Sequence, residues 1–369
     1  MSDSTRRTTS GSLNRREFVK TAAAGAAVAL GAPAIVTASK TGSQVIIGEG
    51  DYRYEANHNW PQLPSQFTWQ TTHNVAIDKD GFVYIVHEGR ADQPDHPSIF
   101  VFDPEGKYVR SFGKQFQGGG HGLEVRTEGN QQYLYVTGYQ ALKMFQKMDL
   151  NGEVVWTKYA PMESGVYAEN EDTKRAKEWG RNRFMPTNYA FPPDGGFILA
   201  DGYGAWYIHR YDEAGNWRSC FGGEGKEDGK FNTPHGVWID SRPGRDPSIV
   251  VADRANGRLQ WFTLDGQHQR TQDGFFLPAN IDVHGELMLV PDLQARVTLL
   301  GRDNQIVAQL GEDPEWRTEV MKMNVRKDPK TWRDGKFAHP HDACFDKDGN
   351  IFVVEWVDTG RITKLTRLP

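Results

Sequence analysis

Cysteine is nearly absent from this chain, which has only Cys220 and Cys344 among its 369 residues. Two thiols so far apart cannot form a disulfide framework or a zinc site of the finger type, so we expect both to be small, buried side chains. Long basic runs are also missing, because 43 Lys and Arg are interspersed with 48 Asp and Glu, for a net charge of −5. This balance argues against a nucleic-acid partner.

Long apolar runs are missing as well. After the first forty residues, no stretch approaches the roughly 18 apolar residues that a membrane-spanning helix needs. Near the N-terminus, Arg15 and Arg16 precede an alanine-rich segment, residues 21–38, which is too short and too weakly apolar for a stable span. The pattern resembles a twin-arginine export signal, with an attached amphipathic helix as the alternative. We predict that residues 1–38 are a removed signal, that residues 39–369 form one domain, and that the protein is periplasmic or secreted.

What the chain does contain is an internal repeat. Each unit continues through a polar turn, such as Lys79-Asp80-Gly81 or Lys347-Asp348-Gly349, into a second β-branched or aromatic run, then a third, and in the first five units a fourth. Such alternation is typical of strands, and four strands per repeat are typical of a propeller blade. The six units begin 44 to 66 residues apart with the segments His73-Asn-Val-Ala-Ile-Asp, His121-Gly-Leu-Glu-Val-Arg, Thr187-Asn-Tyr-Ala-Phe-Pro, His235-Gly-Val-Trp-Ile-Asp, Ala279-Asn-Ile-Asp-Val-His and His341-Asp-Ala-Cys-Phe-Asp.

The repeats predict an all-β, six-bladed propeller with four-stranded blades. The sixth unit stops at Pro369 after three strands, so we expect residues 44–54 to supply the missing outer strand and close the ring. The two widest gaps contain insertions near residues 160–185 and 312–338. Both insertions have helical spacing and many charges, the first within residues 168–183, and we expect both to wall the hub on one face.

The first residue of each unit stands where the innermost strand of a blade begins, at the mouth of the central channel. We call these six first residues the first column. In order, they are His73, His121, Thr187, His235, Ala279 and His341. Histidine in units two, four and six places three imidazoles about 120° apart around the axis of a six-bladed ring, where they converge. Three protein ligands and an open position suit a catalytic Zn²⁺, although imidazole also binds Cu, Ni, Fe or Co. His73 belongs to an odd unit, so we expect it to line the pocket or to be structural.

Other polar residues near the channel mouth extend this hypothesis. Asp342 directly follows His341 and could hold a second, hard cation such as Ca²⁺ together with backbone oxygens, or could orient a ligand histidine. Tyr203 and Arg254 follow the second strands of units three and four. A Tyr hydroxyl beside a metal can act as a general base, and a guanidinium can clamp a carboxylate. The alternatives are packing for Tyr203 and a blade-to-blade salt bridge with Asp253 or another acid for Arg254.

These motifs carry a family resemblance. The repeats resemble NHL repeats, and residues 234–262, with Gly120-His121, Ala200-Asp-Gly-Tyr203 and His339-Pro-His341-Asp342, are similar to the lyase domain of peptidylglycine alpha-amidating monooxygenase. The resemblance covers residues ~70–366. It implies a six-bladed propeller that cleaves peptidyl-α-hydroxyglycine into a peptide amide and glyoxylate.

The resemblance also implies the site residues. It implies a catalytic zinc held by His121, His235 and His341, with Tyr203 and Arg254 as catalytic residues. It further implies a structural calcium held by Asp342 and by the backbone oxygens of Val75 and Leu123.

One position departs from the pattern of the resembled lyases. Their second active-site arginine falls on Glu88 here, with Arg90 two residues further on. We include Arg90 as a catalytic candidate that could take the place of that arginine. The disulfide cysteines of these lyases are missing from this chain.

The sequence therefore favours an exported, metal-dependent lyase that cleaves the C–N bond of an α-hydroxyglycine-type amide or a related α-hydroxyamide. The alternative is a non-catalytic NHL propeller that binds a protein or glycan through its top face, with structural metals only. A lactone- or ester-hydrolysing propeller fits less well, because such sites use Ca²⁺ and carboxylates. We expect a small-molecule or peptide substrate, no nucleic acid, no membrane span and a monomer.

Overall fold

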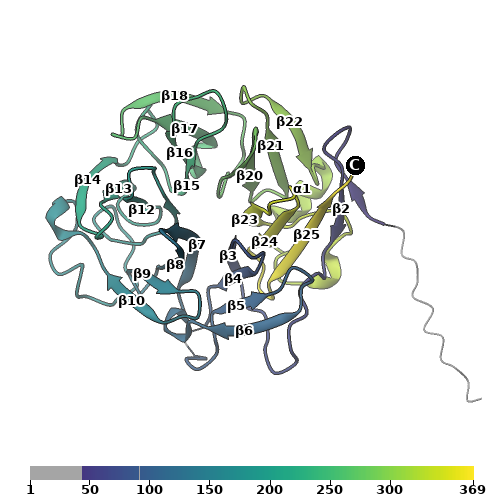
Figure 1. Cartoon of the computed structure of the whole chain (residues 1–369), viewed down its shortest axis with the longest axis horizontal. Helices are drawn as coiled ribbons and strands as arrows, with labels where there is room; N and C mark the ends of the chain where they lie inside the picture. Colours follow the sequence, from purple (N-terminus) through teal and green to yellow (C-terminus); the bar gives the residue numbers. More distant parts are fainter. Residues whose placement is uncertain (1–43, 91) are drawn as a thin grey trace, which may run out of the picture. The chain divides into compact units, whose positions relative to one another are not determined.

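Six antiparallel β-sheets surround a central axis in the computed structural model, which describes residues 44–369 except residue 91 (Figure 1). The predicted export signal, residues 1–38, lies outside the described residues. Among these residues, no helix has the length and apolar character needed to cross a membrane. The ring confirms the predicted six-bladed propeller.

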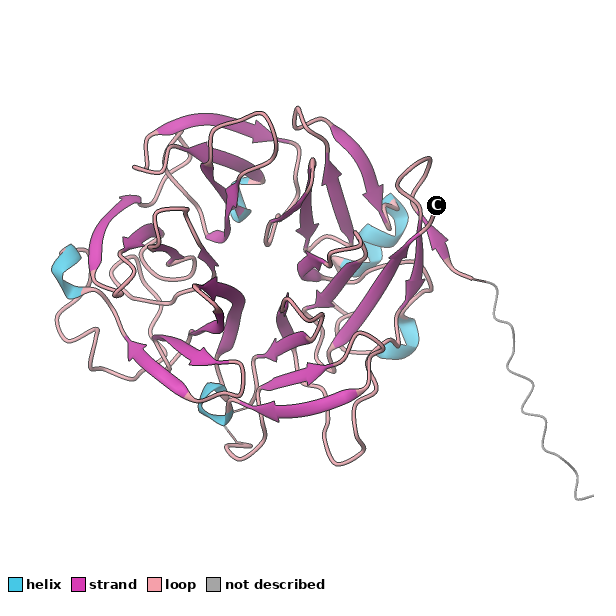
Figure 2. Ribbon diagram, in the orientation of Figure 1, coloured by secondary structure: helices cyan, strands magenta, loops and turns pink. Residues whose placement is uncertain are grey.

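Each blade has its first strand at the hub and its last strand at the rim (Figure 2). The first three blades are β3 (Thr72–Ile77), β4 (Val83–His87), β5 (Ile99–Phe102) and β6 (Tyr108–Phe112); β7 (Gly120–Glu128), β8 (Gln131–Gly138), β9 (Met144–Asp149) and β10 (Val154–Lys158); and β11 (Tyr189–Ala190), β12 (Phe197–Ala200), β13 (Tyr207–Tyr211) and β14 (Trp217–Gly222). The next two are β15 (Pro234–Asp240), β16 (Ser248–Asp253), β17 (Arg258–Phe262) and β18 (His268–Asp273); and β19 (Asp282–His284), β20 (Leu287–Asp292), β21 (Arg296–Leu300) and β22 (Ile306–Leu310).

The sixth blade closes the ring with a strand from the other end of the sequence. Its inner strands are β23 (Pro340–Phe345), β24 (Ile351–Glu355) and β25 (Arg361–Arg367). The outer strand is β2 (Tyr54–Asn57), which pairs antiparallel with β25, and β1 (Ile46–Ile47) adds a fifth strand. The predicted closure is confirmed, with the pairing strand lying at the end of the expected stretch and just beyond it.

The hydrophobic core is divided into clusters between neighbouring blades. Successive side chains of a strand point to opposite faces, so each blade packs on the blade before it and on the blade after it. Val86 of blade 1 packs with Leu134 of blade 2, and Ile198 of blade 3 packs with Val251 of blade 4. Each such fully buried side chain contributes about 1.5–3 kcal/mol. Because apolar burial occurs between blades, the hub can carry polar side chains.

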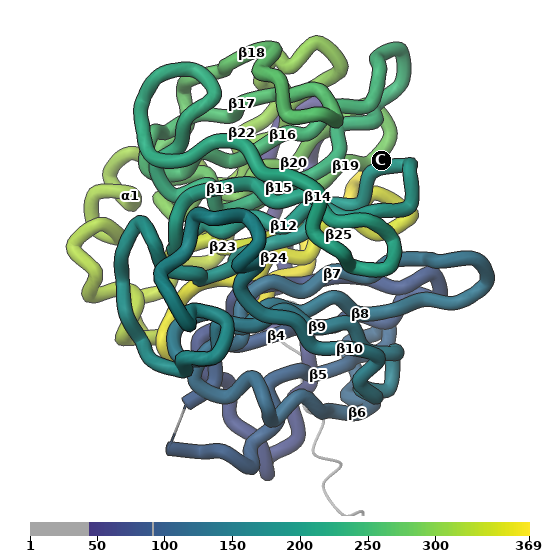
Figure 3. The backbone as a smooth tube through the Cα atoms, turned by 90° about the vertical axis from the view of Figure 1, so that its left-hand side faces the viewer, coloured from purple at the N-terminus to yellow at the C-terminus, as the bar shows by residue number. Residues whose placement is uncertain are grey.

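The two insertions differ in structure. The second forms α1 (Pro314–Val320), in which Asp313 caps the helix by accepting a hydrogen bond from the backbone N–H of Trp316 at 3.0 Å. Figure 3 shows α1 projecting on one side of the ring. Short 3-10 helices elsewhere are η1 (Lys114–Phe116), η2 (Met162–Ser164), η3 (Arg254–Asn256) and η4 (Pro329–Thr331).

The helical spacing of residues 168–183 was a wrong indication, because this segment forms turns. Asn170 has a left-handed backbone with φ of 63°, which interrupts a helix. The next residue, Glu171, is fully buried in ion pairs with Lys143 at 2.6 Å and with Arg183 at 3.0 Å. These buried contacts outweigh the weak helical preference of an isolated charged segment.

Candidate functional site

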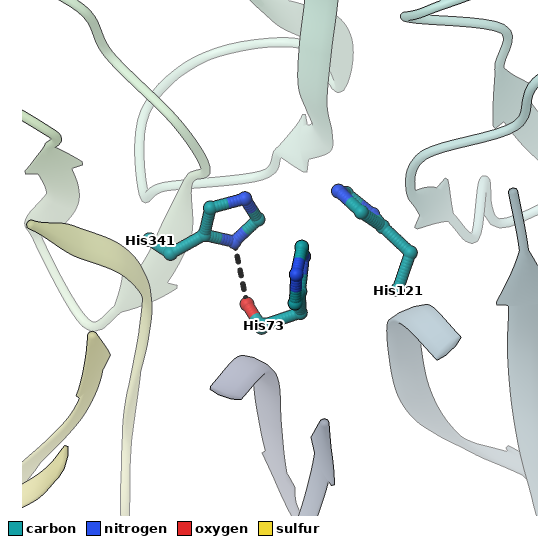
Figure 4. A group of neighbouring side chains, drawn as sticks. All are labelled: His73, His121 and His341. Carbon is teal, nitrogen blue, oxygen red and sulfur yellow. Dashed lines mark hydrogen bonds between the residues drawn. The ribbon is translucent and has the colours of Figure 1, made fainter. Parts of the chain in front are cut away.

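Four buried histidines meet at the hub, one from each of blades 1, 2, 4 and 6. They are His73, His121, His235 and His341, near the starts of β3, β7, β15 and β23. The rings of the three predicted ligands lie close together, with centroids 4.8 Å apart for His121 and His235, 5.1 Å for His121 and His341, and 4.7 Å for His235 and His341. Figure 4 shows His73, His121 and His341 gathered around one space.

The histidines of blades 2, 4 and 6 share one orientation. Nδ1 of each lies within hydrogen-bond distance of the backbone oxygen of the first-column residue in the next blade. The pairs are His121 with Thr187 at 3.1 Å, His235 with Ala279 at 2.6 Å, and His341 with His73 at 2.6 Å. A carbonyl oxygen only accepts, so each Nδ1 must donate. Burial lowers the pKa of all three imidazoles well below the usual range, so each ring is neutral and its Nε2 carries a lone pair.

These Nε2 lone pairs fit a bound metal ion. Nε2 of His121 lies 3.1 Å from Nε2 of His235, and Nε2 of His341 is buried with no hydrogen-bond partner among the described residues. Two nitrogens on one tetrahedral zinc, with Zn–N bonds of about 2.0–2.1 Å, lie about 3.3 Å apart. Carbonyl acceptors on the other ring nitrogen are the outer contacts typical of metal-bound histidine. The buried cluster could therefore hold a metal ion.

His73 belongs to the same cluster, although we expected from the sequence that it would only line the pocket or be structural. Nitrogen atoms of His73, His121 and His341 all lie within 4.8 Å of one another. The surroundings of His73 differ, because neither of its ring nitrogens has a hydrogen-bond partner among the described residues and its Nε2 is 3.5 Å from the Glu88 carboxylate. His73 thus lacks the carbonyl that fixes the tautomer in the other three. The set with three fixed tautomers, which includes His235, is better organised for metal binding.

The glycine after the histidine in blades 2 and 4 has a direct role in this arrangement. A Cβ atom on Gly122 would lie 2.0 Å from the backbone oxygen of Thr187, and one on Gly236 would lie 2.8 Å from that of Ala279. These are the same oxygens that accept the hydrogen bonds from the two histidines. Glycine therefore lets the next blade approach closely enough to orient the ligand.

Tyr203 and Arg254 both reach the histidine cluster. The Tyr203 hydroxyl donates to Nε2 of His235 at 2.9 Å and lies 3.4 Å from Nε2 of His121. Nη1 of Arg254 donates to the Tyr203 oxygen at 3.1 Å, and its guanidinium lies 5.0 Å from the centre of the tyrosine ring. Asp253, the alternative partner for Arg254, is paired instead with Arg258 at 2.7 Å.

Asp201 fixes the loop that carries Tyr203. Its carboxylate accepts hydrogen bonds from the backbone N–H of Met185 at 2.7 Å and of Ala205 at 2.6 Å, and from the Tyr167 hydroxyl at 3.0 Å. Burial raises the pKa of Asp201 to about 6, although these hydrogen bonds oppose the rise. The position of the tyrosine hydroxyl thus depends on a buried carboxyl group.

A cavity of about 540 Å³, here called the mouth cavity, opens beside the histidines. Each blade contributes to it a residue just after its second strand, which is the next residue in five blades and the third residue in blade 3. These residues are Glu88, Tyr139, Tyr203, Arg254, Leu293 and Trp356. The insertions complete the wall with Lys177, Trp179 and Arg326. Sequence reasoning missed Tyr139, Leu293 and Trp356, although their shared position after the second strand is a signal that could have found them.

Glu88 lines the mouth cavity at the position of the expected arginine. Its Oε1 accepts hydrogen bonds from the Tyr139 hydroxyl at 2.9 Å and from the Gln140 amide, and its Oε2 lies 3.5 Å from Nε2 of His73. Burial favours a higher pKa for Glu88, but the nearby His73 and the hydrogen bond from Tyr139 outweigh it and lower the pKa to about 2. Arg90 is exposed and is not among the residues that line the mouth cavity.

A second cavity of about 120 Å³, here called the channel cavity, lies between the hub strands and is lined by Glu124, Asp282 and Asp342. Burial raises the pKa of Asp342 to about 8 and that of Asp282 to about 6, and it raises the pKa of Glu124 well above its usual range. The charges of neighbouring carboxylates add to each of the shifts of Asp342 and Glu124. The channel cavity thus concentrates buried acid in the centre of the ring.

The predicted calcium residues are only partly assembled around this channel cavity. Asp342 accepts a hydrogen bond from the backbone N–H of Val75 at 2.8 Å and another from the Asn280 amide. Its carboxylate therefore contacts the next hub strand and does not orient a histidine. Val75 lines the channel cavity, whereas Leu123 packs in the core between blades 1 and 2 and is not part of the lining.

The fold and the site together define a six-bladed β-propeller with a buried histidine cluster at its hub that could hold a metal ion. No family model matches the chain. The chain is 26% identical over 244 residues to peptidyl-glycine alpha-amidating monooxygenase of Mus musculus, covering 58% of this chain and 23% of that protein. It is 26% identical over 290 residues to peptidyl-alpha-hydroxyglycine alpha-amidating lyase 1 of Drosophila melanogaster, covering 72% and 48%.

Human NHL repeat-containing protein 3 is also similar, with 27% identity over 216 residues that cover 58% of this chain and 57% of that protein. The chain spans less than two thirds of the length of each of these relatives. The sequence identity to these relatives confirms the resemblance to NHL propellers and to amidating lyases.

Solved structures support the fold alone. Virginiamycin B lyase of Staphylococcus aureus superposes with a TM-score of 0.51 at 14% identity, covering 85% of this chain and 100% of that chain. A gluconolactonase of Xanthomonas campestris superposes with a TM-score of 0.52 at 12% identity, covering 88% and 91%.

Proposed function

We propose that this protein is an exported, zinc-dependent lyase that cleaves the C–N bond of an α-hydroxyglycine-type amide, or of a related α-hydroxyamide, to an amide and glyoxylate or its equivalent. One observation carries the proposal. Three neutral histidines from alternate blades, each fixed by a backbone carbonyl, meet at the hub, where the Tyr203 hydroxyl contacts Nε2 of His121 and His235 and Arg254 contacts Tyr203.

His121, His235 and His341 would hold the metal, which when bound supplies Lewis-acid polarisation of the substrate hydroxyl and carbonyl oxygens. Zinc is the ion we propose, because a three-imidazole site with an open position suits it. His73 stands beside this set and lines the same cavity. We assign it a supporting contact to the metal site.

The side chains of this site have separate roles in the proposed reaction. Tyr203, in its phenolate form, takes the proton of the substrate hydroxyl as the C–O bond becomes a carbonyl and the C–N bond breaks. The electron pair of the C–N bond goes to the amide nitrogen, which receives a proton, so that the reaction balances without an oxidant. Arg254 holds the substrate carboxylate and, through its hydrogen bond at 3.1 Å, keeps the Tyr203 oxygen in place.

We also propose a structural Ca²⁺ in the channel, with Asp342 and the backbone oxygens of Val75 and Leu123 as ligands. The donor set favours a hard cation, because carboxylate and carbonyl oxygens are what Ca²⁺ prefers. The support from geometry is the buried Asp342 carboxylate beside Val75 in the next blade. Export through the N-terminal signal, a periplasmic or secreted location and a monomeric state are part of the same proposal.

Metal analysis and a product assay test this function. Natively exported protein should contain stoichiometric zinc and release glyoxylate from a hydroxyglycine or hippurate-type substrate, and chelation should abolish release. Zinc-loaded protein that releases no glyoxylate from a panel of α-hydroxyamides would contradict the lyase proposal. Intact partner binding by a His121→Ala, His235→Ala protein would then favour a propeller that only binds.

A further inference from the structure

Two opposite charges face each other across the mouth cavity. Glu88 lines the mouth cavity from blade 1 and Arg254 lines it from blade 4, so the two lie on opposite sides of the six-bladed ring, with two blades between them on either side. The histidine cluster lies between them at the hub. A small substrate bound over the metal site can therefore meet the carboxylate with one end and the guanidinium with the other.

The carboxylate of Glu88 is held so that one oxygen remains available. Tyr139 and Gln140 both donate to Oε1, which fixes the side chain. Oε2 receives no hydrogen bond from the described residues and has only the 3.5 Å contact with Nε2 of His73. The side chain is 22% exposed and lines the cavity. A fixed, partly buried carboxylate oxygen is a good acceptor for a charged N–H donor.

Among the described residues, no arginine or lysine of the mouth cavity forms an ion pair with Glu88, whose one such contact is with His73. Arg326 is paired with Asp358 at 3.1 Å and stacks on Trp356 at 3.5 Å. The positive charge of Lys177, which lines the cavity, lowers the pKa of Glu88, but no ion pair within 4 Å joins the two side chains in the described structure. Arg254 is directed at Tyr203 on the far side.

The walls of blades 5 and 6 add an apolar surface. Leu277, Leu293 and Trp356 lie there, between the acidic and the basic positions. The cavity of about 540 Å³ is within the range that holds a compact ligand, and it is large enough for a molecule of dipeptide size.

We propose that Glu88 determines substrate specificity by binding a cationic amine, so that the substrate is a small zwitterion of the aminoacyl-α-hydroxyglycine class. Its carboxylate binds Arg254, its free ammonium group binds Oε2 of Glu88, and an apolar side chain packs on Leu293 and Trp356. This inference rests on the proposed function, and it deepens that function by naming the substrate class.

The test uses two substrates that differ only in the amine. Leucyl-α-hydroxyglycine and its N-acetyl derivative are compared with the zinc-loaded protein. The free amine should be preferred by about tenfold in kcat/KM, the size expected for a hydrogen bond to a charged group, mainly through a lower KM. In Glu88→Gln, which keeps the acceptor at Oε1 and removes the charge, the preference should fall toward one. Glu286→Gln, an exposed acid on blade 5 that is 59% exposed, is the matched control and should keep the preference.

A binding experiment separates this inference from the proposed reaction. Leucinamide and N-acetyl-leucinamide, which correspond to the amide products, are titrated calorimetrically into wild type and Glu88→Gln. Tighter binding of leucinamide that disappears in Glu88→Gln supports the role of Glu88 even if no substrate is turned over, in which case only the proposed reaction fails. Equal binding of the two amides by wild type, or a preference that persists in Glu88→Gln with unchanged zinc content and melting temperature, overturns the inference.

Discussion

The mouth cavity and the channel cavity share hub strands but bury different kinds of polar group. At the mouth, three neutral imidazoles donate from Nδ1 to carbonyl oxygens and keep a lone pair on Nε2. In the channel, Glu124, Asp282 and Asp342 are buried carboxyl groups whose pKa values are raised. β7 and β23 contribute to both regions, so one strand carries an imidazole at the mouth cavity and, within a few residues, a carboxyl group at the channel cavity.

The difference shows how one scaffold can separate two cation types. Imidazole nitrogen favours borderline ions such as zinc, and it stays neutral when burial lowers its pKa. Carboxyl oxygen favours hard ions, and without a cation a buried carboxyl group stays protonated to a higher pH. If the comparison holds, metal loss at the mouth should abolish activity, whereas loss of a channel carboxylate should lower stability.

The largest effect is expected for His235→Ala. Loss of one Nε2 donor should remove zinc and lower kcat/KM by about 10³-fold or more, because Lewis-acid stabilisation is worth several kcal/mol and each 1.4 kcal/mol is a factor of ten. Metal content by mass spectrometry and glyoxylate release measure this. His268→Ala, on the outer strand β18, is the control and should retain zinc. Full activity in metal-free His235→Ala would contradict the claim that activity depends on a metal ion at the mouth cavity.

Tyr203→Phe should have the next largest effect. The substitution removes the hydroxyl that lies 2.9 Å from Nε2 of His235, but it keeps the ring that packs on Tyr139 and under Arg254. We expect kcat to fall about 10²-fold, as for loss of a general base, with zinc still stoichiometric. Unchanged kcat would remove Tyr203 from the reaction and leave it a packing role.

Asp342→Asn tests the channel side of the comparison. An amide in place of the carboxylate loses one of the two acceptors that now serve Val75 and Asn280, and it removes the charge proposed to bind calcium. We expect the free energy of unfolding to fall by about 1–3 kcal/mol, with the stabilising effect of added Ca²⁺ lost. Denaturation with and without Ca²⁺ measures both. A variant that Ca²⁺ stabilises as much as wild type would place the ion elsewhere.

The smallest effect is a pH dependence set by Asp201. Its pKa of about 6 in the folded chain is above the usual value near 3.9, so its contribution to stability is complete below pH 4 and is lost as the pH rises through 6. The stability deficit of Asp201→Asn relative to wild type should therefore shrink by about 1 kcal/mol between pH 5 and pH 6.5. A deficit that stays constant over this range would mean that the carboxyl group is ionised in the folded protein throughout.

The fold could be predicted because its signals are local and repeated. Alternating runs and polar turns recur in every unit. Asp78 and Asp346 show how such turns form, since each accepts backbone N–H groups two and four residues further on. The first-column histidines could be found for the same reason, because their spacing repeats. The insertion at residues 168–183 could not be predicted well, since its shape depends on the distant Lys143.

The site also contained features that a single sequence does not reveal. The involvement of His73 depends on the distance between blades, and the even-and-odd argument from sequence set it aside. The roles of Tyr139 and Trp356 depend on how six loops converge over one cavity. The pairing of Gly122 with the Thr187 oxygen appears only when neighbouring blades are seen together, although the His-Gly dipeptide itself is visible in the sequence.

The hydrogen bond from His341 to the backbone oxygen of His73 crosses the seam where the last blade meets the first (Figure 4). This imidazole cannot be oriented in a chain whose first and last blades have not yet packed together. The three ligands are therefore in place only after the ring of blades has closed. Retention of a tightly held ion would then report successful assembly, and a quality-control step that monitors metal uptake would detect unfinished molecules.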